Sequence, residues 1–281
     1  MPDSDFHVPD GTDREAALAR TTHLGIGAHQ DDLEFMAFHG IAECLHSKDR
    51  WFGGIICTDG AGSSRTGPYA DTSDGDLRKV RVREQRQAAD IGRYSFIAQL
   101  NYPSASITHP LGTPIVSDLR DLIGSAKPDV IYTHNPADKH ATHIRVVVAV
   151  LAAIQSLPQS DRPSALYGCE MWRGLDWMDD SEKVVMDVSG HGHMASALNG
   201  VFDSQIAGGK RYDLAVAGRR KANATLLDSH RGDGMTDAAF AMDLSPLIGK
   251  DPSDLVEFTV GFVNRLQSSI ENNLNNALST L

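Results

Sequence analysis

Short apolar segments of strand type alternate with segments of helical period along much of the chain, and this alternation limits the fold more than any other feature. Periodicity and turn residues predict strands at 23–27, 51–57, 95–100 and 130–134, each followed by a helix, at 35–46, 77–91, 117–125 and 142–155. Strands joined by helices pair in parallel through right-handed crossovers. The sequence therefore predicts an α/β fold with a doubly wound, mostly parallel, Rossmann-like sheet that has helices on both faces.

The rest of the chain contains further candidate elements. Strands are predicted at 165–171 and 183–188, and helices at 194–206, 211–227 and 253–275. No repeat or linker divides the chain, and 281 residues are enough to bury one large core. We expect a single domain over 1–281, with a core at about 22–230 and a helical C-terminal extension at 231–281.

Charge and cysteine usage exclude several classes of partner and location. The formal net charge of −11 repels a polyanion, so nucleic acid is not an expected partner. The three cysteines form no CxxC pair and are interpreted as small buried hydrophobic residues in a reducing compartment. The first twenty residues lack the pattern of a signal peptide, and no uncharged apolar stretch is long enough to span a membrane. We expect a cytoplasmic protein with no membrane partner.

A cluster of metal-binding residue types follows the first of these strands. The run His29-Gln30-Asp31-Asp32 lies at the turn into the next helix, at the carboxyl end of a strand, which is where α/β sheets place their sites. Imidazole and carboxylate suit a zinc ion, which in catalytic sites has three protein ligands and an open position for water. We expect His29 and Asp32 to bind one ion, which leaves Asp31 free to take a proton from water.

A second cluster follows the strand at 130–134. His140 and His143 form an HxxH pair at the start of the helix at 142–155, and Asp138 precedes them. Neither HxxH nor HxDD is specific alone in a chain with 12 histidines. Both clusters, however, follow strands of one predicted parallel sheet, so they lie at the same edge of that sheet and can meet there.

Simpler interpretations exist for both clusters. Asp31 or Asp32 can cap the following helix, where exposed amides favour carboxylates, although capping does not account for His29. The HxxH pair can be a solvated first helical turn. The run Gly25-Ile26-Gly27 begins like a dinucleotide-binding fingerprint, but the third glycine is missing and two carboxylates would repel a pyrophosphate. Nicotinamide binding is therefore rejected as the main interpretation.

Four motifs occur in a defined order: AHQDDLEF at 28–35, TDG at 58–60, Arg81-x-x-Glu84-x-x-x-Ala88, and DKHATH at 138–143. In this order and at these strand ends they resemble the PIG-L/LmbE-like zinc-dependent N-acetylglucosaminyl deacetylases, over about residues 22–230. Gln30 replaces the usual proline of the first motif, and Ala141-Thr142 replaces the Pro-Asp common inside the HxxH pair. None of these three positions is a ligand in the pattern.

The resemblance implies a hydrolase that removes an N-acetyl group from an amino sugar or sugar conjugate. His29, Asp32 and His143 would bind Zn²⁺, or another divalent metal. Asp31 would be the general base, and His140 would stabilise the oxyanion or protonate the leaving amine. The resemblance also suggests a homo-oligomer. Two alternatives stay open: a deacylase of a non-sugar amide on the same zinc site, and a non-catalytic sugar-binding or metal-binding protein, against which Asp31 and His140 argue.

Substrate recognition has weaker signals. Arg81 matches a family arginine near the sugar site, and its guanidinium can bind a hydroxyl or a carboxylate, but with Arg83 and Arg86 it can equally form a solvated basic helix face. We also place Asp138 in the substrate-binding region, where it can orient His140. The alternative for Asp138 is a loop carboxylate that faces water.

Later segments can reach the same edge of the sheet. The loop at 59–76 can close over a substrate as a lid. Glu170 and Trp172 lie at the end of the strand at 165–171, where Trp172 can stack on a sugar, and His193 can approach from its helix. In the turn at 208–212, glycines beside Lys210 and Arg211 can receive an anion. The alternatives are a disordered loop, a core or interface tryptophan, a surface histidine and a solvated turn.

Overall fold

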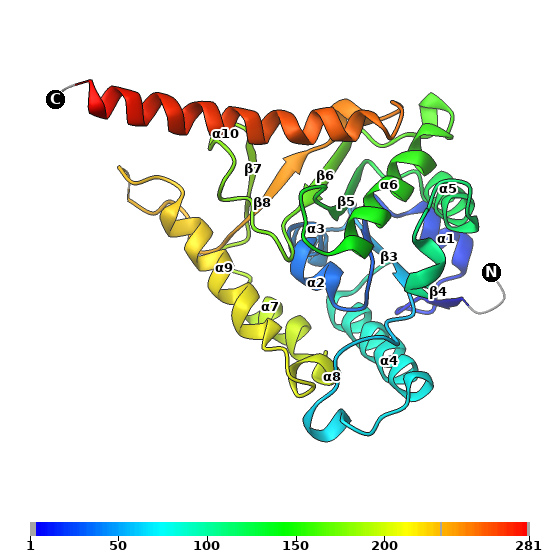
Figure 1. The fold of residues 1–281 in the computed structure, drawn as a ribbon. Coiled ribbons are helices and arrows are strands. Elements are labelled where there is room, and N and C mark those ends of the chain that lie inside the picture. Colours follow the sequence, from blue (N-terminus) through cyan, green and yellow to red (C-terminus); the bar gives the residue numbers. More distant parts are fainter. Residues whose placement is uncertain (1–3, 231, 280–281) are drawn as a thin grey trace.

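The computed structural model describes residues 4–230 and 232–279, and these form one eight-stranded sheet covered by helices (Figure 1). The strand order is β1-β4-β3-β2-β5-β6-β8-β7. The five strands β4, β3, β2, β5 and β6 are mutually parallel, whereas β1 and β8 pair antiparallel with their neighbours. This confirms the mostly parallel, doubly wound sheet. The strands are β1 Asp5–His7, β2 His23–Gly27, β3 Phe52–Thr58, β4 Phe96–Tyr102, β5 Val130–His134, β6 Ala165–Cys169, β7 Lys183–Asp187 and β8 Ala238–Asp243.

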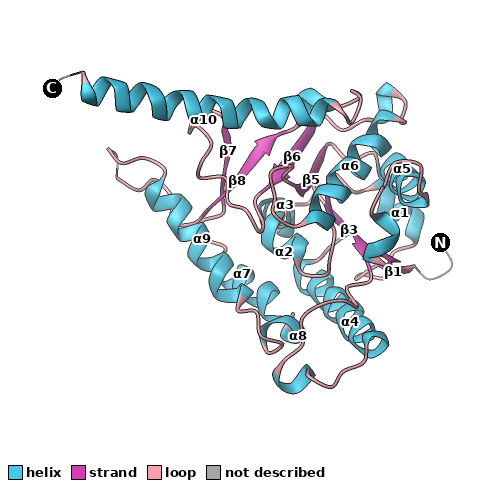
Figure 2. Cartoon of the chain, in the orientation of Figure 1, coloured by secondary structure: helices cyan, strands magenta, loops and turns pink. Residues whose placement is uncertain are grey.

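Helices cover both faces of the sheet, as predicted (Figure 2). One apolar core lies between the sheet and α1, α5, α6 and α10, and a second lies between the opposite face and α2, α3, α4 and α7. The helices are α1 Arg14–Ala19, α2 Asp32–Met36, α3 Phe38–Leu45, α4 Asp74–Gly92, α5 Pro114–Ala126, α6 Ala141–Gln155, α7 Gly192–Gly200, α8 Asp203–Ile206, α9 Tyr212–Leu226 and α10 Asp254–Leu278.

The order of the strands reverses between β2 and β5. The chain runs from β2 outward through β3 to β4, and then returns to place β5 and β6 on the other side of β2. The loops that leave β2 and β5 therefore diverge, and a crevice forms between them at the carboxyl ends of the strands. Gly27 ends β2, and a Cβ atom there would lie 3.0 Å from the Cβ of Asp32. Its absence lets the next loop fold back over the strand.

Three parts of the chain differ from the prediction. The helix expected at 35–46 is two helices, because the backbone leaves helical geometry at Ala37. The helix expected at 194–206 is likewise α7 and α8, which are separated at Phe202. The C-terminal extension at 231–281, for which only a helix at 253–275 was expected, also contains β8, which pairs with β6 and β7. The prediction also missed β1 and α1.

The cysteines match the prediction: Cys44, Cys57 and Cys169 are free and buried. In the part of the chain that the structure describes, we find no helix with the length and apolar character needed to cross a bilayer.

Candidate active site

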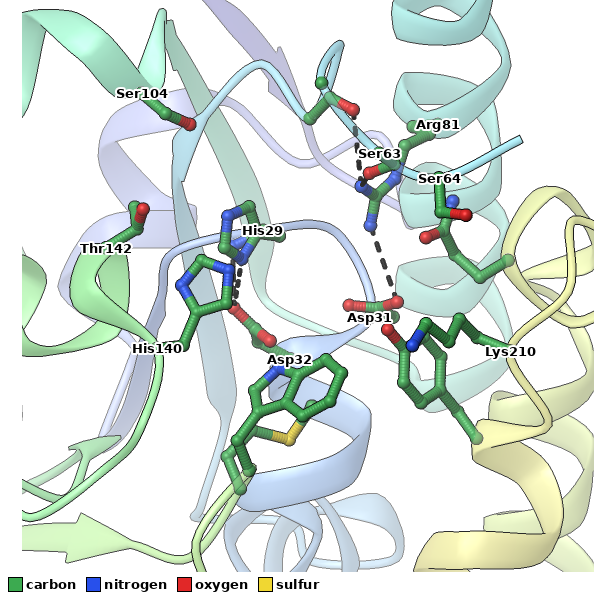
Figure 3. A pocket seen from close by; sticks show the side chains of 16 residues that line it. His29, Asp31, Asp32, Ser63, Ser64, Arg81, Ser104, His140, Thr142 and Lys210 are labelled. Carbon is green, nitrogen blue, oxygen red and sulfur yellow. Dashed lines mark hydrogen bonds and ion pairs between the residues drawn. The ribbon is translucent and has the colours of Figure 1, made fainter.

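A cavity of about 370 Å³ opens at the carboxyl ends of the central strands (Figure 3). Five of the seven predicted site residues line it, and the other two, Asp138 and His143, are buried behind its surface. We call His29, Asp32 and His140 the histidine wall, and Ser63, Ser64 and Lys210, which lie across the cavity in Figure 3, the loop wall. The complete lining is His29, Asp31, Asp32, Gly60, Gly62, Ser63, Ser64, Arg81, Ser104, His140, Thr142, Met171, Trp172, Gln205, Lys210 and Tyr212.

Three side chains that can bind a metal converge on one point: His29 and Asp32, which belong to the histidine wall, and the buried His143. His29 Nδ1 lies 3.3 Å from Asp32 Oδ2 and 3.3 Å from His143 Nε2, and His143 Nε2 lies 3.5 Å from Asp32 Oδ1. A tetrahedral zinc ion with ligand distances of 2.0–2.1 Å requires its ligand atoms to be about 3.3 Å apart. The three groups therefore fit a divalent cation.

Asp138 fixes the orientation of the His143 ring. Its Oδ2 lies 3.2 Å from His143 Nδ1 and accepts a hydrogen bond from Trp172 N, while its Oδ1 accepts from the amides of Lys139 and His140. Burial, together with His134, lowers the pKa of His143 to about 4, so the ring is neutral near pH 7. With its proton on Nδ1, the Nε2 lone pair is directed to the cation site. Asp138 does not line the cavity and so does not face a substrate there.

Asp32 is buried between histidines that favour its ionised form. Burial opposes ionisation, but His143 and His134 lower the pKa of this carboxyl well below its usual value. His29 N donates a hydrogen bond of 2.7 Å to Asp32 Oδ2, which closes the turn between β2 and α2.

His134 is a neighbour of the site that the sequence analysis did not assign. It ends β5 and is fully buried, its Nε2 lies 3.3 Å from Asp32 Oδ2, and it accepts a hydrogen bond from Ala28 N. Its ring stacks on His143 with 3.7 Å between the centroids. The sequence did give one sign of this role: His134 is the last residue of a predicted central strand, at the edge of the sheet where the site lies.

His134, Asp138 and His143 form a second group with donor atoms close enough for a cation. None of the three lines the cavity, and all are buried. Hydrolytic chemistry needs a coordination position open to water and substrate. The group with His29 and Asp32, which do line the cavity, meets this condition.

Asp31 is held in an unusual backbone conformation beside the cation site. Its φ of 95° lies in the left-handed region, which costs an aspartate on the order of 1–3 kcal/mol. Gln85, on α4, accepts a hydrogen bond from Asp31 N, and the Arg81 Nη2 atom lies 3.4 Å from Asp31 Oδ2. Burial raises the pKa of Asp31 well above its ordinary value, although Arg81 opposes the shift. A carboxylate with a raised pKa is a stronger base.

Helix α4 carries Arg81 and Glu84 of the third predicted motif, and both residues contact the segments around the cavity. Arg81 lines the cavity, but it also donates to the carbonyl oxygens of Gln30 and Gly60 and to Ser63 Oγ. Glu84 accepts hydrogen bonds from both N and Oγ of Ser204, at 2.7 and 2.6 Å. The helix thus joins the loop after β2 to the loop wall and to α8.

His140 and two aromatic residues border the cavity. The His140 ring lies 5.0 Å from that of His29 and 4.5 Å from that of His143, between centroids, and its Nδ1 is buried without a hydrogen-bond partner. Burial and the nearby His29 lower the pKa of His140. Trp172 lies 6.3 Å from His140 and packs edge to face with Tyr212 at 5.9 Å.

The loop wall comes from two segments far apart in sequence. Ser63 and Ser64 belong to the loop at 59–76, and Lys210 belongs to the turn before α9. The Nζ atom of Lys210 lies 5.3 Å from the centre of the Trp172 ring, and no ion pair of Lys210 occurs within the described ranges. The hydroxyl of Tyr69 donates to Asp203, which ties the same loop to α8.

Two other predicted candidates, Glu170 and His193, do not line the cavity. Glu170 is buried away from the cavity and accepts hydrogen bonds from Asn223 and from the amides of Leu175 and Phe240. His193 is exposed on α7 and does not line the cavity. Gln30, in place of the expected proline, is buried and donates to Gln99 Oε1 on β4, which holds the loop.

Comparisons with known proteins agree with the motifs. The family model described as PIG-L, GlcNAc-PI de-N-acetylase, matches residues 24–154, which include both clusters. A protein of Escherichia coli K12 described as the uncharacterized deacetylase YaiS is 29% identical over 157 residues, which cover 54% of this chain and 78% of that protein. These matches confirm the family resemblance inferred from the motifs.

Solved structures share the fold at low sequence identity. N,N'-diacetylchitobiose deacetylase from Pyrococcus horikoshii superposes with a TM-score of 0.63 at 14% identity, covering 85% of this chain and 89% of that one. The 4-carboxy-2-hydroxymuconate hydratase GalB from Pseudomonas putida KT2440 superposes with a TM-score of 0.61 at 17% identity, covering 80% and 96%. Because different chemistries occur on this fold, the function has to be argued from the site.

Proposed function

Residues 24–154 match the PIG-L family model, and from this premise we propose that the chain is a metal-dependent N-deacetylase that acts on an amino sugar or sugar conjugate. The proposed metal ligands are His29, Asp32 and His143, with zinc as the expected ion. The proposed general base is Asp31, and His140 is proposed to interact with the substrate at the reacting amide.

One observation supports this proposal most strongly. Three candidate ligand side chains, whose nearest nitrogen and oxygen atoms are 3.3–3.5 Å apart, lie beside a buried carboxylate that does not belong to the ligand set, at the edge of an open cavity. A storage or purely structural metal site does not need a free carboxylate with a raised pKa next to it. A hydrolytic site does, because water must lose a proton when it attacks an amide.

Each protein group has a separate role in the proposed reaction. When bound, the cation supplies Lewis acidity, which polarises a carbonyl and lowers the pKa of water towards ~7. Asp31 accepts the proton of the attacking water, and Arg81 holds its carboxylate in place. His140 lies on the cavity side of the ligand set, where its imidazole can hydrogen-bond the developing oxyanion or pass a proton to the leaving amine.

The remaining lining suits a small polar molecule with a flat apolar face. Trp172 and Tyr212 offer aromatic surfaces on which a sugar ring can stack. Ser63, Ser64 and Lys210 offer hydrogen-bond donors opposite the histidine wall. The volume of about 370 Å³ is within the range of small-molecule sites.

A substrate panel tests the reaction class. We would incubate the protein with N-acetylated amino sugars and, in parallel, with non-sugar acetamides, and measure free amine and acetate with and without a chelator. We expect amine release from the sugars that stops on chelation and returns with Zn²⁺. Release from non-sugar acetamides alone would favour the other deacylase, and no release from any substrate would contradict the proposal.

Replacing the base separates catalysis from metal binding. In Asp31→Asn the ligand set is intact, so we expect one metal ion per chain and a fall in kcat of about 10²–10⁴-fold. Asp49→Asn, at an exposed position outside the cavity, is the matched control and should behave as wild type. Undiminished turnover in Asp31→Asn would rule out this residue as the base.

A further inference from the structure

Helix α10 leaves a long apolar face exposed. Six of the ten large hydrophobic side chains that are exposed in the described structure lie on it: Val256, Val260, Val263, Ile270, Leu274 and Leu278, with exposed fractions between 46 and 70%. Figure 1 shows that the C-terminal half of the helix extends past the rest of the molecule. Every residue from 267 to 279 is exposed, so none of this half is buried in the core of its own domain.

Five of these six residues, all but Leu278, follow a heptad repeat that Gln267 and Ala277 complete. Val256, Val260, Val263, Gln267, Ile270, Leu274 and Ala277 are separated alternately by four and three residues, the spacing by which one helix packs along another. We call this row the α10 stripe. Leu255, Phe258 and Phe262 pack on the core from the opposite side of the same helix. The stripe is therefore additional to the face that attaches α10 to its own sheet.

We propose that the α10 stripe packs against the α10 stripe of a second copy of this chain. A heptad seam is covered by a helix that presents the same repeat, and a second copy provides such a helix. At 1.5 Å per residue the row from Val256 to Ala277 is about 32 Å long, enough for a paired seam of three heptads.

The charges of α10 favour self-association over other occupants. From 266 to 279 Glu271 is the single charged residue, and it accepts a hydrogen bond from Gln267. A membrane with anionic lipids or an acidic protein would need basic residues here, and none follows Arg265. Two copies, each with a net charge of −11, can meet along this uncharged half with little like-charge repulsion.

The molar mass in solution tests the proposal. We would measure light scattering after gel filtration over a dilution series for the full-length protein, for Ile270→Glu with Leu274→Glu, and for Asn272→Glu with Asn275→Glu. The two Asn substitutions add the same charge to the exposed C-terminal half of α10, but they lie off the stripe. We expect wild type and the Asn pair to give at least twice 30.4 kDa, and the stripe variant to give the mass of one chain.

Since Ile270 and Leu274 are exposed on the single chain, the stripe variant should still fold and should melt in one cooperative transition. A wild type that is monomeric throughout the series, or a stripe variant that keeps the oligomeric mass, would overturn the proposal. So would a monomer that instead floats with vesicles of phosphatidylcholine and phosphatidylglycerol, because the stripe would then bind membranes.

Discussion

The two walls of the cavity are built in different ways. The histidine wall comes from the short loops at the ends of β2 and β5, and its residues are buried or half-buried and bonded to one another and to Asp138 and His134. The loop wall comes from the long loop at 59–76 and the turn before α9, and its lysine is exposed with no ion-pair partner within the described ranges. From this comparison we propose that the first wall determines the reaction and the second determines which substrate is held.

Removing a ligand from the histidine wall should have the largest effect. His143→Ala deletes one of three proposed ligands, so we expect loss of the bound metal and of measurable activity. Elemental analysis after gel filtration measures the metal, and His109→Ala, at an exposed position, is the control. If His143→Ala retains one metal ion per chain, the ligand set is wrong.

His140 should affect catalysis without affecting the metal. In His140→Ala we expect a fall in kcat of about 10²–10³-fold, the usual effect of removing one donor to an oxyanion. Metal content should stay at one ion per chain, because His140 is not in the ligand set. A loss of metal equal to that of His143→Ala would instead make His140 a ligand.

Asp138 should affect metal affinity through His143. Asp138→Asn leaves all three ligands but weakens the contact that orients the His143 ring, so we expect metal affinity to fall about 10–100-fold. Activity should return when excess Zn²⁺ is added. An unchanged dissociation constant in a chelator competition would show that the ring is held by its packing against His134 alone.

Replacing Trp172 should give the smallest effect, and that effect should be on substrate binding and not on the chemical step. Loss of a stacking surface in Trp172→Ala should raise KM about tenfold for a sugar substrate, with kcat within a few fold of wild type. Steady-state kinetics measures KM and kcat separately. A fall in kcat with unchanged KM would mean that Trp172 acts on the reacting amide and does not only bind the sugar.

Much of the histidine wall could be predicted because it depends on local sequence. Buried parallel strands are short apolar runs, and the predicted bounds of β2 and β5 agree with the structure at every residue. The reversal of strand order then places the residues after these strands in one crevice. His134 was not assigned because its position at the end of a strand indicates the edge of the site but not that its ring contacts Asp32.

The loop wall and the C-terminal part were less predictable, for physical reasons. Tyr212 and Lys210 reach the cavity only through the packing of α8 and α9, which no short-range pattern records. Strand β8 has the sequence AAFAMD, and its alanines and methionine favour a helix in isolation. Pairing with β6 and β7 overrides that preference.

The central claim is that His29, Asp32 and His143 hold one divalent ion beside Asp31. Anomalous diffraction at the zinc absorption edge, from crystals grown with Zn²⁺, tests it most directly. We expect a single peak about 2.0–2.2 Å from His29 Nδ1, His143 Nε2 and the Asp32 carboxylate, on the cavity side. A peak enclosed by His134, Asp138 and His143, or no peak at the cavity, would contradict the claim.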